Sequence, residues 1–400
     1  MTAHILTLNA GSSSIKFALF AAGATGPSAV MTGQVEKIGG DPRITAKNAD
    51  GASLADTHLR ADAAHDHHGA CAAILALLEN LFPETAVDAV GHRVVHGGPD
   101  FEAPVVVDNA ILATLAAFSP FAPLHQPHNL AGIKAARGAF PGALQVACFD
   151  TAFHRGHPWV NDTFALPRAL YDKGVRRYGF HGLSYDYISG ALATMAPTLH
   201  AGRVVVAHLG NGASMCGLLG GRSVGSTMGF TAVDGLPMGT RCGQLDPGVI
   251  LYLVQQEGMS IEEVETLIYS QSGLLGLSGL SNDMRTLEQA RTPEASQAID
   301  YFVFRVRREL GALAAVLGGL DALVFTGGIG EHSVMVREKV CEGMGWLGIE
   351  LDHAANDGHG PVITTPLSRV RVLVMPTNEE KVIARAAQAL MTSAPAPVAA

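Results

Sequence analysis

The chain has 400 residues, of which 48% are hydrophobic and 16% are charged, and its formal net charge is −9. A chain of this length is longer than one hydrophobic core usually accommodates, which predicts two domains. The composition is that of a packed globular protein rather than a disordered one. The acidic balance, with no basic block longer than RVRR (305–308), argues against nucleic-acid binding.

Targeting and membrane signals are not expected. The N-terminal sequence MTAHILTLNAG has neither a basic region nor a cleavage site of the signal-peptide type. The most apolar stretch, residues 311–325, is interrupted by two glycines and an aspartate and is too short for a membrane span. Five cysteines without CxxC spacing favour reduced thiols in a cytoplasmic protein.

The first predicted element is a hairpin in LTLNAGSSSIKFALF (6–20), where two apolar runs flank a Gly/Ser turn. The elements expected after it are strand and loop over 22–66, a helix over 67–82 closed by Pro83, a buried strand over 86–95, helices over 109–117 and 129–139, and a strand over 143–149 that ends at Asp150. This alternation predicts an α/β domain with functional groups at the carboxyl ends of its strands.

The composition becomes rich in Gly, His and Arg near residue 151, which predicts domains at 1–150 plus about 381–400 and at 151–380. The sequence VVVAHLGNGASMCGLL (204–219) repeats the shape of the first hairpin, because aligning Leu8 with Leu209 also aligns Gly11 with Gly212. The remaining expected elements are a helix over 294–317, a strand over 322–325 followed by a turn in TGGIGE, a helix over 379–391, and a frayed tail over 392–400.

Three Gly-rich turns follow apolar runs: NAGSSSIK (9–16), HLGNG (208–212) and TGGIGE (326–331). Backbone N–H groups in such turns can bind phosphate oxygens, and the first turn adds hydroxyls and Lys16. It is not a Walker A loop, because the chain continues as a strand. Each turn alone is also compatible with an ordinary tight turn, but three after strands favour nucleotide binding.

Two arginines and a histidine lie in Gly-flanked segments: Arg93 in GHRVVHGG, His181 in RYGFHG and Arg241 in MGTRCG. A single arginine is usually a solvated surface residue. In cramped turns after buried strands, however, the guanidinium group suits a carboxylate or phosphate. Together these three side chains can hold a transferring phosphoryl group.

Carboxylates suited to Mg²⁺ are Asp150, Asp283 and Glu379. Glu379 and Glu380 are equally compatible with acids in the first turn of a helix. The HDHH sequence (65–68) has no cysteine or carboxylate at metal-ligand spacing and is expected to be a solvated loop. His154 and His157 do not form an HExxH motif.

The chain resembles the acetate kinase family of short-chain carboxylate kinases. The motifs that carry the resemblance occur in family order from residue 8 to about 385: NAGSSSIK, GHRVVHGG, APLH, FDTAFH, YGFHG, HLGNG, MGFT…MGTR…LDP, SGLLG…S.DMR, GGIGE and PTNEE. The resemblance implies a duplicated ribonuclease-H-like α/β fold of the actin, Hsp70 and sugar-kinase type, with two domains and a central cleft. It also implies a homodimer, Mg²⁺ with Mn²⁺ as a substitute, and the reaction ATP + acetate ⇌ ADP + acetyl phosphate.

The resemblance further implies a role for each matching position. The chemical step is assigned to Asp150 as catalytic acid and to His181 and Arg241 as transition-state stabilisers. The small-substrate site is assigned to Arg93 for the carboxylate and to Val95, Leu124 and Phe180 for the acyl methyl. The magnesium site corresponds to Asn9 and Glu379. The ATP-binding positions are Ser12, Ser14, Lys16, His208, Leu209, Gly210, Asn211, Gly212, Asp283, Met284, Arg285, Gly328, Ile329, Gly330, Glu331 and His332.

Three positions depart from the family pattern. Ala232 replaces the proline of MGFTP, which leaves room for a longer acyl chain, so that a propionate or butyrate kinase is the alternative. The family's GIGEN reads GIGEH, with His332 near the expected adenosine, and YGFHGTSH reads YGFHGLSY (178–185). An alternative of a different class is a non-catalytic nucleotide switch, but such a protein would not need the second anion-binding set of Arg93, His181 and Arg241.

Overall fold

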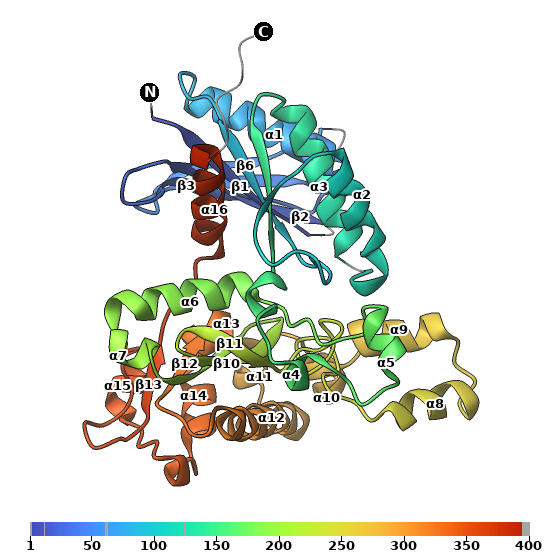
Figure 1. Cartoon of the computed structure of the whole chain (residues 1–400), viewed down its shortest axis with the longest axis vertical. Coiled ribbons are helices and arrows are strands. Elements are labelled where there is room, and N and C mark those ends of the chain that lie inside the picture. The colour runs from blue at the N-terminus through green and yellow to red at the C-terminus, as the bar shows by residue number, and fades with distance from the viewer. Residues whose placement is uncertain (1, 12, 61–62, 124, 394–400) are drawn as a thin grey trace. The chain divides into compact units, whose positions relative to one another are not determined.

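The computed structural model describes residues 2–11, 13–60, 63–123 and 125–393. It consists of two compact units, which are Met1–Phe153 with Asn378–Ala400 and, between them in sequence, His154–Thr377 (Figure 1). The domain boundaries expected from sequence were 150/151 and 380/381. The unit boundaries lie at Phe153/His154 and Thr377/Asn378 instead, and Glu379 therefore belongs to the first unit rather than the second. The tail beyond residue 393 is outside the described residues.

The described part of the first unit contains one sheet. Its strands are β1 (His4–Ala10), β2 (Ser14–Ala21), β3 (Ser28–Glu36), β4 (Arg43–Asn48), β5 (Ser53–His58), β6 (Ala89–Val94), β7 (Val105–Val106) and β8 (Leu144–Phe149). They lie in the order β5-β4-β3-β2-β1-β6-β8-β7. β1 pairs antiparallel with β2 and parallel with β6, and β6 pairs parallel with β8.

Helices cover both faces of this sheet. They are α1 (His67–Leu81), α2 (Asn109–Ala117), α3 (Gln126–Ala139) and α16 (Glu379–Ser393), with short turns η1 (Ser119–Phe121) and η2 (Ala152–His154). Figure 1 shows α1 and α3 on one side of the sheet and α16 on the other. Leu6, Leu8 and Ala10 join the core formed with α1 and α3. Gly91 faces α16, since a Cβ there would lie 2.4 Å from Cγ2 of Ile383.

The second unit repeats the central part of this sheet. Its strands are β9 (Arg203–Leu209), β10 (Ala213–Leu219), β11 (Arg222–Ser226), β12 (Ala322–Thr326) and β13 (Arg371–Val374), in the order β11-β10-β9-β12-β13. The β9–β10 and β10–β11 pairs are antiparallel, and β9–β12 and β12–β13 are parallel. The β3-β2-β1-β6-β8 part of the first sheet has the same pattern. The duplicated α/β fold predicted from sequence is therefore confirmed.

The second unit is rich in helices. They are α4 (Trp159–Asp162), α5 (Arg168–Asp172), α6 (Gly182–Met195), α7 (Pro197–His200), α8 (Pro247–Gln255), α9 (Ile261–Ser270), α10 (Gly273–Ser278), α11 (Met284–Gln289), α12 (Pro293–Leu317), α13 (Gly327–His332), α14 (Val334–Cys341), η3 (Gly345–Leu347) and α15 (His353–Asp357). Figure 1 shows α6 and α12 on opposite sides of the sheet. A Cβ on Gly217 would touch Leu313 of α12 at 3.5 Å, so Ser214, three positions earlier on β10, faces the α6 side.

One local prediction was wrong, and a second was wrong in part. TGGIGE was expected to form a turn, but Gly327–His332 is the short helix α13. Gly327 makes this junction possible, because its φ is +76° and a Cβ there would lie 2.8 Å from the carbonyl oxygen of Leu209. The HDHH sequence (65–68) was expected to be a loop, but its last two residues open α1 (His67–Leu81), whose start agrees with the helix expected over 67–82. Oδ1 of Asp66 accepts a hydrogen bond from Gly69 N at 2.8 Å, and an Asp at the N-cap stabilises this helix start.

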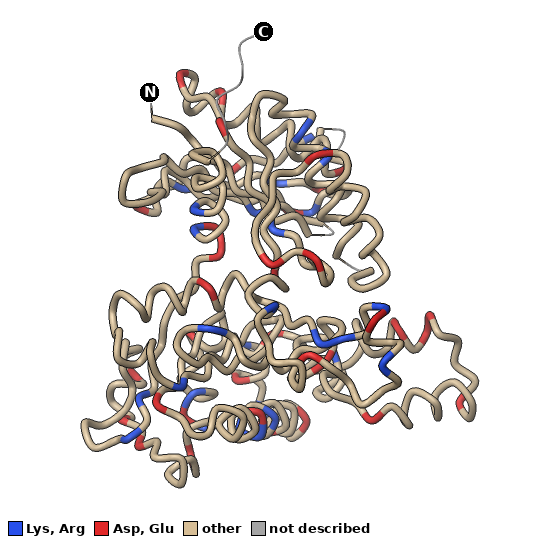
Figure 2. The backbone as a smooth tube through the Cα atoms, viewed as in Figure 1, with Lys and Arg blue, Asp and Glu red and all other residues tan. Residues whose placement is uncertain are grey.

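Charged residues are dispersed along the described backbone of each unit, with Lys and Arg interspersed among Asp and Glu (Figure 2). All five cysteines lie in the described part of the chain and are thiols. Within that same part, no helix combines the length and the apolar character needed to cross a membrane.

Candidate active site

In the first unit, the predicted residues Asn9, Arg93, Asp150 and Glu379 form one cluster. Nη2 and Nε of Arg93 donate to the two carboxylate oxygens of Asp150 at 2.7 and 3.0 Å. Nη1 of Arg93 donates to Oδ1 of Asn9 at 3.4 Å, and Nε lies 3.8 Å from Oε2 of Glu379. The arginine is therefore firmly bound along one edge and only weakly contacted at Nη1.

Strand alternation explains why these residues meet. Leu8 of β1 is in register with His92 of β6, so Asn9 and Arg93 occupy neighbouring positions on the same face of the sheet. That face carries α16, whose first residue is Glu379. Asp150 directly follows β8, and its N–H donates to the carbonyl of Val94 at 3.1 Å. The carboxyl ends of parallel strands thus bring together three distant segments, as expected for this fold class.

The electrostatics of this cluster are unusual. Burial opposes the charge on Arg93, but the carboxylates of Asp150 and Glu379 outweigh it and raise the pKa of Arg93. Burial also raises the pKa of Glu379 to about 7; the guanidinium of Arg93 counteracts this and the carboxylate of Asp150 adds to it. Two acidic groups therefore share one arginine in a largely buried place, which leaves room for another positive charge.

Lys16 is paired with Asn9 in the β1–β2 register, and its charge also acts on Glu379. The N-terminal turn is closed by Gly11 N, which donates to the carbonyl of Ser14 at 2.8 Å. A residue that sequence reasoning did not assign supports this turn, since Nε2 of His67 lies 2.7 Å from the carbonyl oxygen of Gly11. Ser12 lies outside the described residues.

Of the three residues assigned to the acyl pocket, two are described. Val95, in the first unit, is 6% exposed, and its N–H donates to Oδ1 of Asn129 at 3.0 Å. Phe180, in the second unit, is 1% exposed. Leu124 lies outside the described residues. Each described residue is thus an apolar side chain beside a polar residue of its own unit, Val95 two positions after Arg93 and Phe180 directly before His181.

In the second unit, the predicted His181 is the residue before α6 and has a left-handed backbone, with φ 57° and ψ 25°. Its Nδ1 lies 2.8 Å from Oγ of Ser214, and its ring stacks on His208 with centroids 4.4 Å apart. His208 and Ser214 are directly opposite each other in the β9–β10 register. The two strands therefore present both side chains to the start of α6.

Arg241 comes close to the same place. A Cβ on Gly212 would lie 3.3 Å from Nε2 of His181 and 3.9 Å from Nη1 of Arg241, so both side chains flank the HLGNG turn. Nη1 of Arg241 also donates to the carbonyl of Ala232 at 3.2 Å. The loop that carries Arg241 is held on this turn, because Gly239 N donates to the carbonyl of Asn211 at 3.0 Å.

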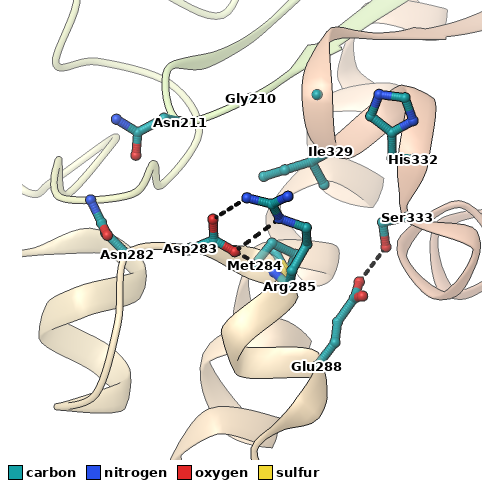
Figure 3. Close-up of a pocket in the computed structure, with 11 residues that line it drawn as sticks. Gly210, Asn211, Asn282, Asp283, Met284, Arg285, Glu288, Ile329, His332 and Ser333 are labelled. Carbon is teal, nitrogen blue, oxygen red and sulfur yellow. Dashed lines mark hydrogen bonds and ion pairs between the residues drawn. The ribbon is translucent and has the colours of Figure 1, made fainter. Parts of the chain in front are cut away.

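A cavity of about 550 Å³ lies beside the HLGNG turn in the second unit (Figure 3). Its volume is in the range of small-molecule sites. Residues from the three predicted ATP segments and three further positions line it: Gly210, Asn211, Asn282, Asp283, Met284, Arg285, Glu288, Gly328, Ile329, His332 and Ser333. Figure 3 shows the paired side chains of Asp283 and Arg285 between Asn211 and His332.

The other predicted ATP-segment residues have contacts away from this lining. Oε1 of Glu331 accepts from Gly327 N at 2.9 Å, which ties α13 to its own start. Gly330 packs on Phe325 of β12. Leu209 is fully buried, and His208 stacks on His181. These residues therefore support the segments that line the cavity and do not line it themselves.

Sequence reasoning missed Asn282, Glu288 and Ser333 in this cavity. Glu288 and Ser333 are hydrogen-bonded to each other across it (Figure 3). Glu288 lies one helical turn and a half after Asp283, which caps α11 by accepting from Arg285 N at 2.8 Å and Thr286 N at 3.2 Å. The cap was a usable signal, because it predicts a helix whose exposed face continues the SNDMR segment.

A sequence model of the Acetokinase family matches residues 4–385. The chain belongs to this family. It is 58% identical to an acetate kinase of Methylocella silvestris over 398 residues, which is 98% of each chain. It is 51% identical to an acetate kinase of Rhizobium meliloti over 389 residues, or 97% of this chain and 98% of the other.

Solved structures of Acetokinase-like proteins agree with this assignment. The crystal structure of Porphyromonas gingivalis acetate kinase matches with a TM-score of 0.87 and 37% identity over 97% of this chain and all of the other. A propionate kinase from Francisella tularensis matches with a TM-score of 0.89 and 36% identity over 96% and 98% of the two chains. Family membership and the shared fold thus confirm the resemblance found from sequence motifs, while the two solved structures carry different acyl preferences in their names.

Proposed function

We propose that the chain is an ATP:acetate phosphotransferase that makes acetyl phosphate and ADP reversibly by direct in-line transfer. The observation that carries this proposal is the state of Arg93. Asp150 holds two of its nitrogens, while within the described residues the hydrogen bond of Nη1 is the long one of 3.4 Å to Asn9. A small carboxylate can pair with this remaining edge, as guanidinium groups commonly do.

A carboxylate acceptor does not require a general base. Small carboxylic acids have pKa values close to those of Asp and Glu and are ionised at neutral pH. Catalysis then consists of positioning two anions and stabilising the charge of the transferring phosphoryl group. We assign the second task to His181 and Arg241, which both flank Gly212. Asp150, bound to Arg93 on two nitrogens, acts by orienting that guanidinium rather than by donating a proton.

The donor set of the first-unit cluster fits Mg²⁺, with Mn²⁺ as a substitute. Glu379 supplies a carboxyl group whose pKa is raised by burial and by the nearby carboxylate of Asp150, so that a cation bound there would stabilise its charged form, and Asn9 adds an amide oxygen. Among the described residues, no group of three or more His, Cys, Asp or Glu could hold an ion. A site with two protein ligands is what Mg²⁺ uses when water and substrate phosphates complete its shell. When bound, the ion would neutralise charge on those phosphates.

The nucleotide is assigned to the cavity of the second unit. Gly210 and Gly328 expose backbone for phosphates, and a Cβ on Gly328 would meet nothing within 4 Å. Met284 and Ile329 provide apolar surface for a base. The residues Ser14 and Lys16 of the first unit are assigned to the phosphoryl group in transit.

Within this proposal, the alternative concerns the acyl chain, because a propionate or butyrate kinase would have the same reaction type. Ala232, at the position of the family's pocket proline, is small, and a propionate kinase is among the similar structures. We propose acetate because Val95, two residues after Arg93, is a branched and buried side chain.

Hydroxamate formation from acetate, propionate and butyrate, measured with ATP and Mg²⁺, tests the proposal. The highest kcat/KM is expected for acetate, and Arg93→Ala should lower it by roughly 100-fold or more, as for a lost charged partner. Arg203→Ala, which removes an equally paired arginine from the second unit, is the matched control. ATP binding without carboxylate-dependent ADP release would instead favour the non-catalytic nucleotide switch.

We also propose a cytoplasmic homodimer. The thiol state of all five cysteines supports a reducing compartment. The second unit exposes large apolar side chains, among them Phe304 at 58% and Leu251 at 57%, which is typical of surfaces that are covered in an oligomer. Light scattering on the purified protein measures the mass directly, and a monomer at micromolar concentration would contradict the dimer.

A further inference from the structure

The backbone of His181 is in a conformation that its side-chain contacts must maintain. A non-glycine residue with φ 57° is strained, and His181 is one of three such residues in the described chain. Its ring is enclosed by the stacked His208 on one face and by Ser214 at Nδ1. Nε2, the other nitrogen, faces Gly212. The orientation of the ring therefore depends on what holds the hydroxyl of Ser214.

Tyr185 holds that hydroxyl. Its OH lies 2.5 Å from Oγ of Ser214, and both residues are completely buried. Tyr185 is one turn after His181 on α6, where its N–H donates to the carbonyl of His181 at 3.1 Å. Its ring also packs edge-on against His154, with centroids 5.6 Å apart. Tyr185 thus connects to both the backbone and, through Ser214, the imidazole of His181.

We propose that Tyr185 is a positioning residue for phosphoryl transfer, which through Ser214 keeps the imidazole of His181 oriented with a hydrogen on Nε2 toward Gly212. The inference rests on the proposed function. Hydroxyl groups both donate and accept, so the Tyr185–Ser214 pair can point its hydrogens in either direction. When the Ser214 hydroxyl donates to Nδ1, neutral His181 carries its hydrogen on Nε2, and when the hydroxyl accepts from Nδ1–H, the charged ring carries a hydrogen on both nitrogens. In the proposed arrangement Nε2 therefore has a hydrogen in both charge states.

This role belongs to a position where the sequence departs from the family pattern, since YGFHGTSH reads YGFHGLSY and ends in Tyr185. A phenol reaches the Ser214 hydroxyl from α6, and a histidine at the same place offers a ring nitrogen for the same bond. Tyr185→His is therefore the conservative variant, and Tyr185→Phe removes only the hydroxyl.

The test combines kinetics with ¹⁵N-histidine NMR. Tyr185→Phe should lower kcat by roughly 10- to 100-fold, as for a misoriented catalytic group, with KM for ATP and acetate within about threefold. Tyr185→His should recover most of kcat. Ser214→Ala should likewise lower kcat with little change in KM. The double variant Tyr185→Phe with Ser214→Ala should have a kcat no lower than that of Ser214→Ala alone. Tyr178→Phe removes an equally buried hydroxyl, bonded to the carbonyl of Gly174, and should change neither parameter.

NMR makes the result independent of the reaction. The ¹⁵N signals of His181, identified by their loss in His181→Asn, should report a hydrogen on Nε2 in the wild type and a mixture of tautomers in Tyr185→Phe. If Tyr185→Phe fails to fold, Ser214→Ala takes its place in both measurements. Unchanged kcat in a folded variant, or unchanged His181 signals, would overturn the inference. A tautomer shift in a protein that phosphorylates no carboxylate would leave the positioning intact and refute the proposed function.

Discussion

Asp150 and Arg93 are bound to each other through two contacts, Nη2 to Oδ2 at 2.7 Å and Nε to Oδ1 at 3.0 Å. The residue that the family resemblance labels as a catalytic acid is therefore a carboxylate that fixes a guanidinium. Asp150 is only 1% exposed, and its partner is the group assigned to the substrate carboxylate. This relationship changes the role expected of Asp150 from proton transfer to orientation.

Replacing Asp150 with asparagine should therefore reduce turnover by misplacing Arg93. We expect kcat/KM for acetate to fall by about 30- to 1,000-fold, which corresponds to about 2–4 kcal/mol for a disrupted buried charge pair. Steady-state hydroxamate assays measure it. Asp321→Asn is the matched control, because Asp321 makes an equivalent two-point contact with Arg203. This pair lies where β9 and β12 begin, whereas the HLGNG turn and α13 lie at the other ends of these strands. Near-normal turnover of Asp150→Asn with an unchanged Mg²⁺ dependence would show that this orientation is not needed.

The acyl preference should respond to residue 232. Ala232→Pro restores the ring expected from the family pattern and keeps the carbonyl that accepts from Arg241 at 3.2 Å. We expect the ratio of kcat/KM for propionate to that for acetate to decrease by about tenfold, the scale of one methylene in an apolar pocket. The measurement is the same assay with both acids. An unchanged ratio would mean that Ala232 does not border the acyl chain.

The cavity beside the HLGNG turn should control nucleotide affinity. Ile329→Ala removes apolar surface from its lining, and we expect KM for ATP to rise by about 3- to 10-fold while KM for acetate stays constant. Calorimetric titration with ADP measures the nucleotide affinity directly. Ile261→Ala, at a position 63% exposed and outside the lining, should behave as the wild type. Equal nucleotide affinity in the two variants would place the base elsewhere.

Acid should destabilise the fold partly through His92. Burial lowers the pKa of His92 to about 4 from a usual 6.5, while its hydrogen bond to Gln145 at 2.8 Å opposes the shift. Above pH 6.5 both folded and unfolded chains hold His92 neutral, so its contribution is complete. Between pH 6.5 and 4 only the unfolded chain takes up the proton, and stability decreases as pH falls, by on the order of 3 kcal/mol.

Urea unfolding at a series of pH values measures how the free energy of unfolding decreases as pH falls. His92→Gln should flatten the loss between pH 6.5 and 4, whatever it does to stability at pH 7. His58→Gln is the control, since its side chain is 63% exposed. The same slope in His92→Gln and wild type would assign the acid sensitivity to other groups, of which His154 and His157, also with pKa values lowered by burial, are the next candidates.

The sequence by itself determined the elements and the family. Helix 109–117 was predicted with the observed bounds of α2, and the two hairpins, the strand before Asp150 and the long helix α12 were found within a few residues. These features depend on local periodicity, prolines and glycines, which neighbouring residues encode. The ordered motifs fixed the family for the same reason, because each is a short contiguous string.

Tertiary structure alone decided which side chains meet. The pairing of Arg93 with Asp150 joins positions 57 residues apart, and Glu379 reaches them from the far end of the chain. The link from Tyr185 through Ser214 to His181 depends on the β9–β10 register and on the face that α6 covers. Sheet register and helix packing are set by the whole core rather than by local sequence, and they decide which of the predicted site residues lie close together.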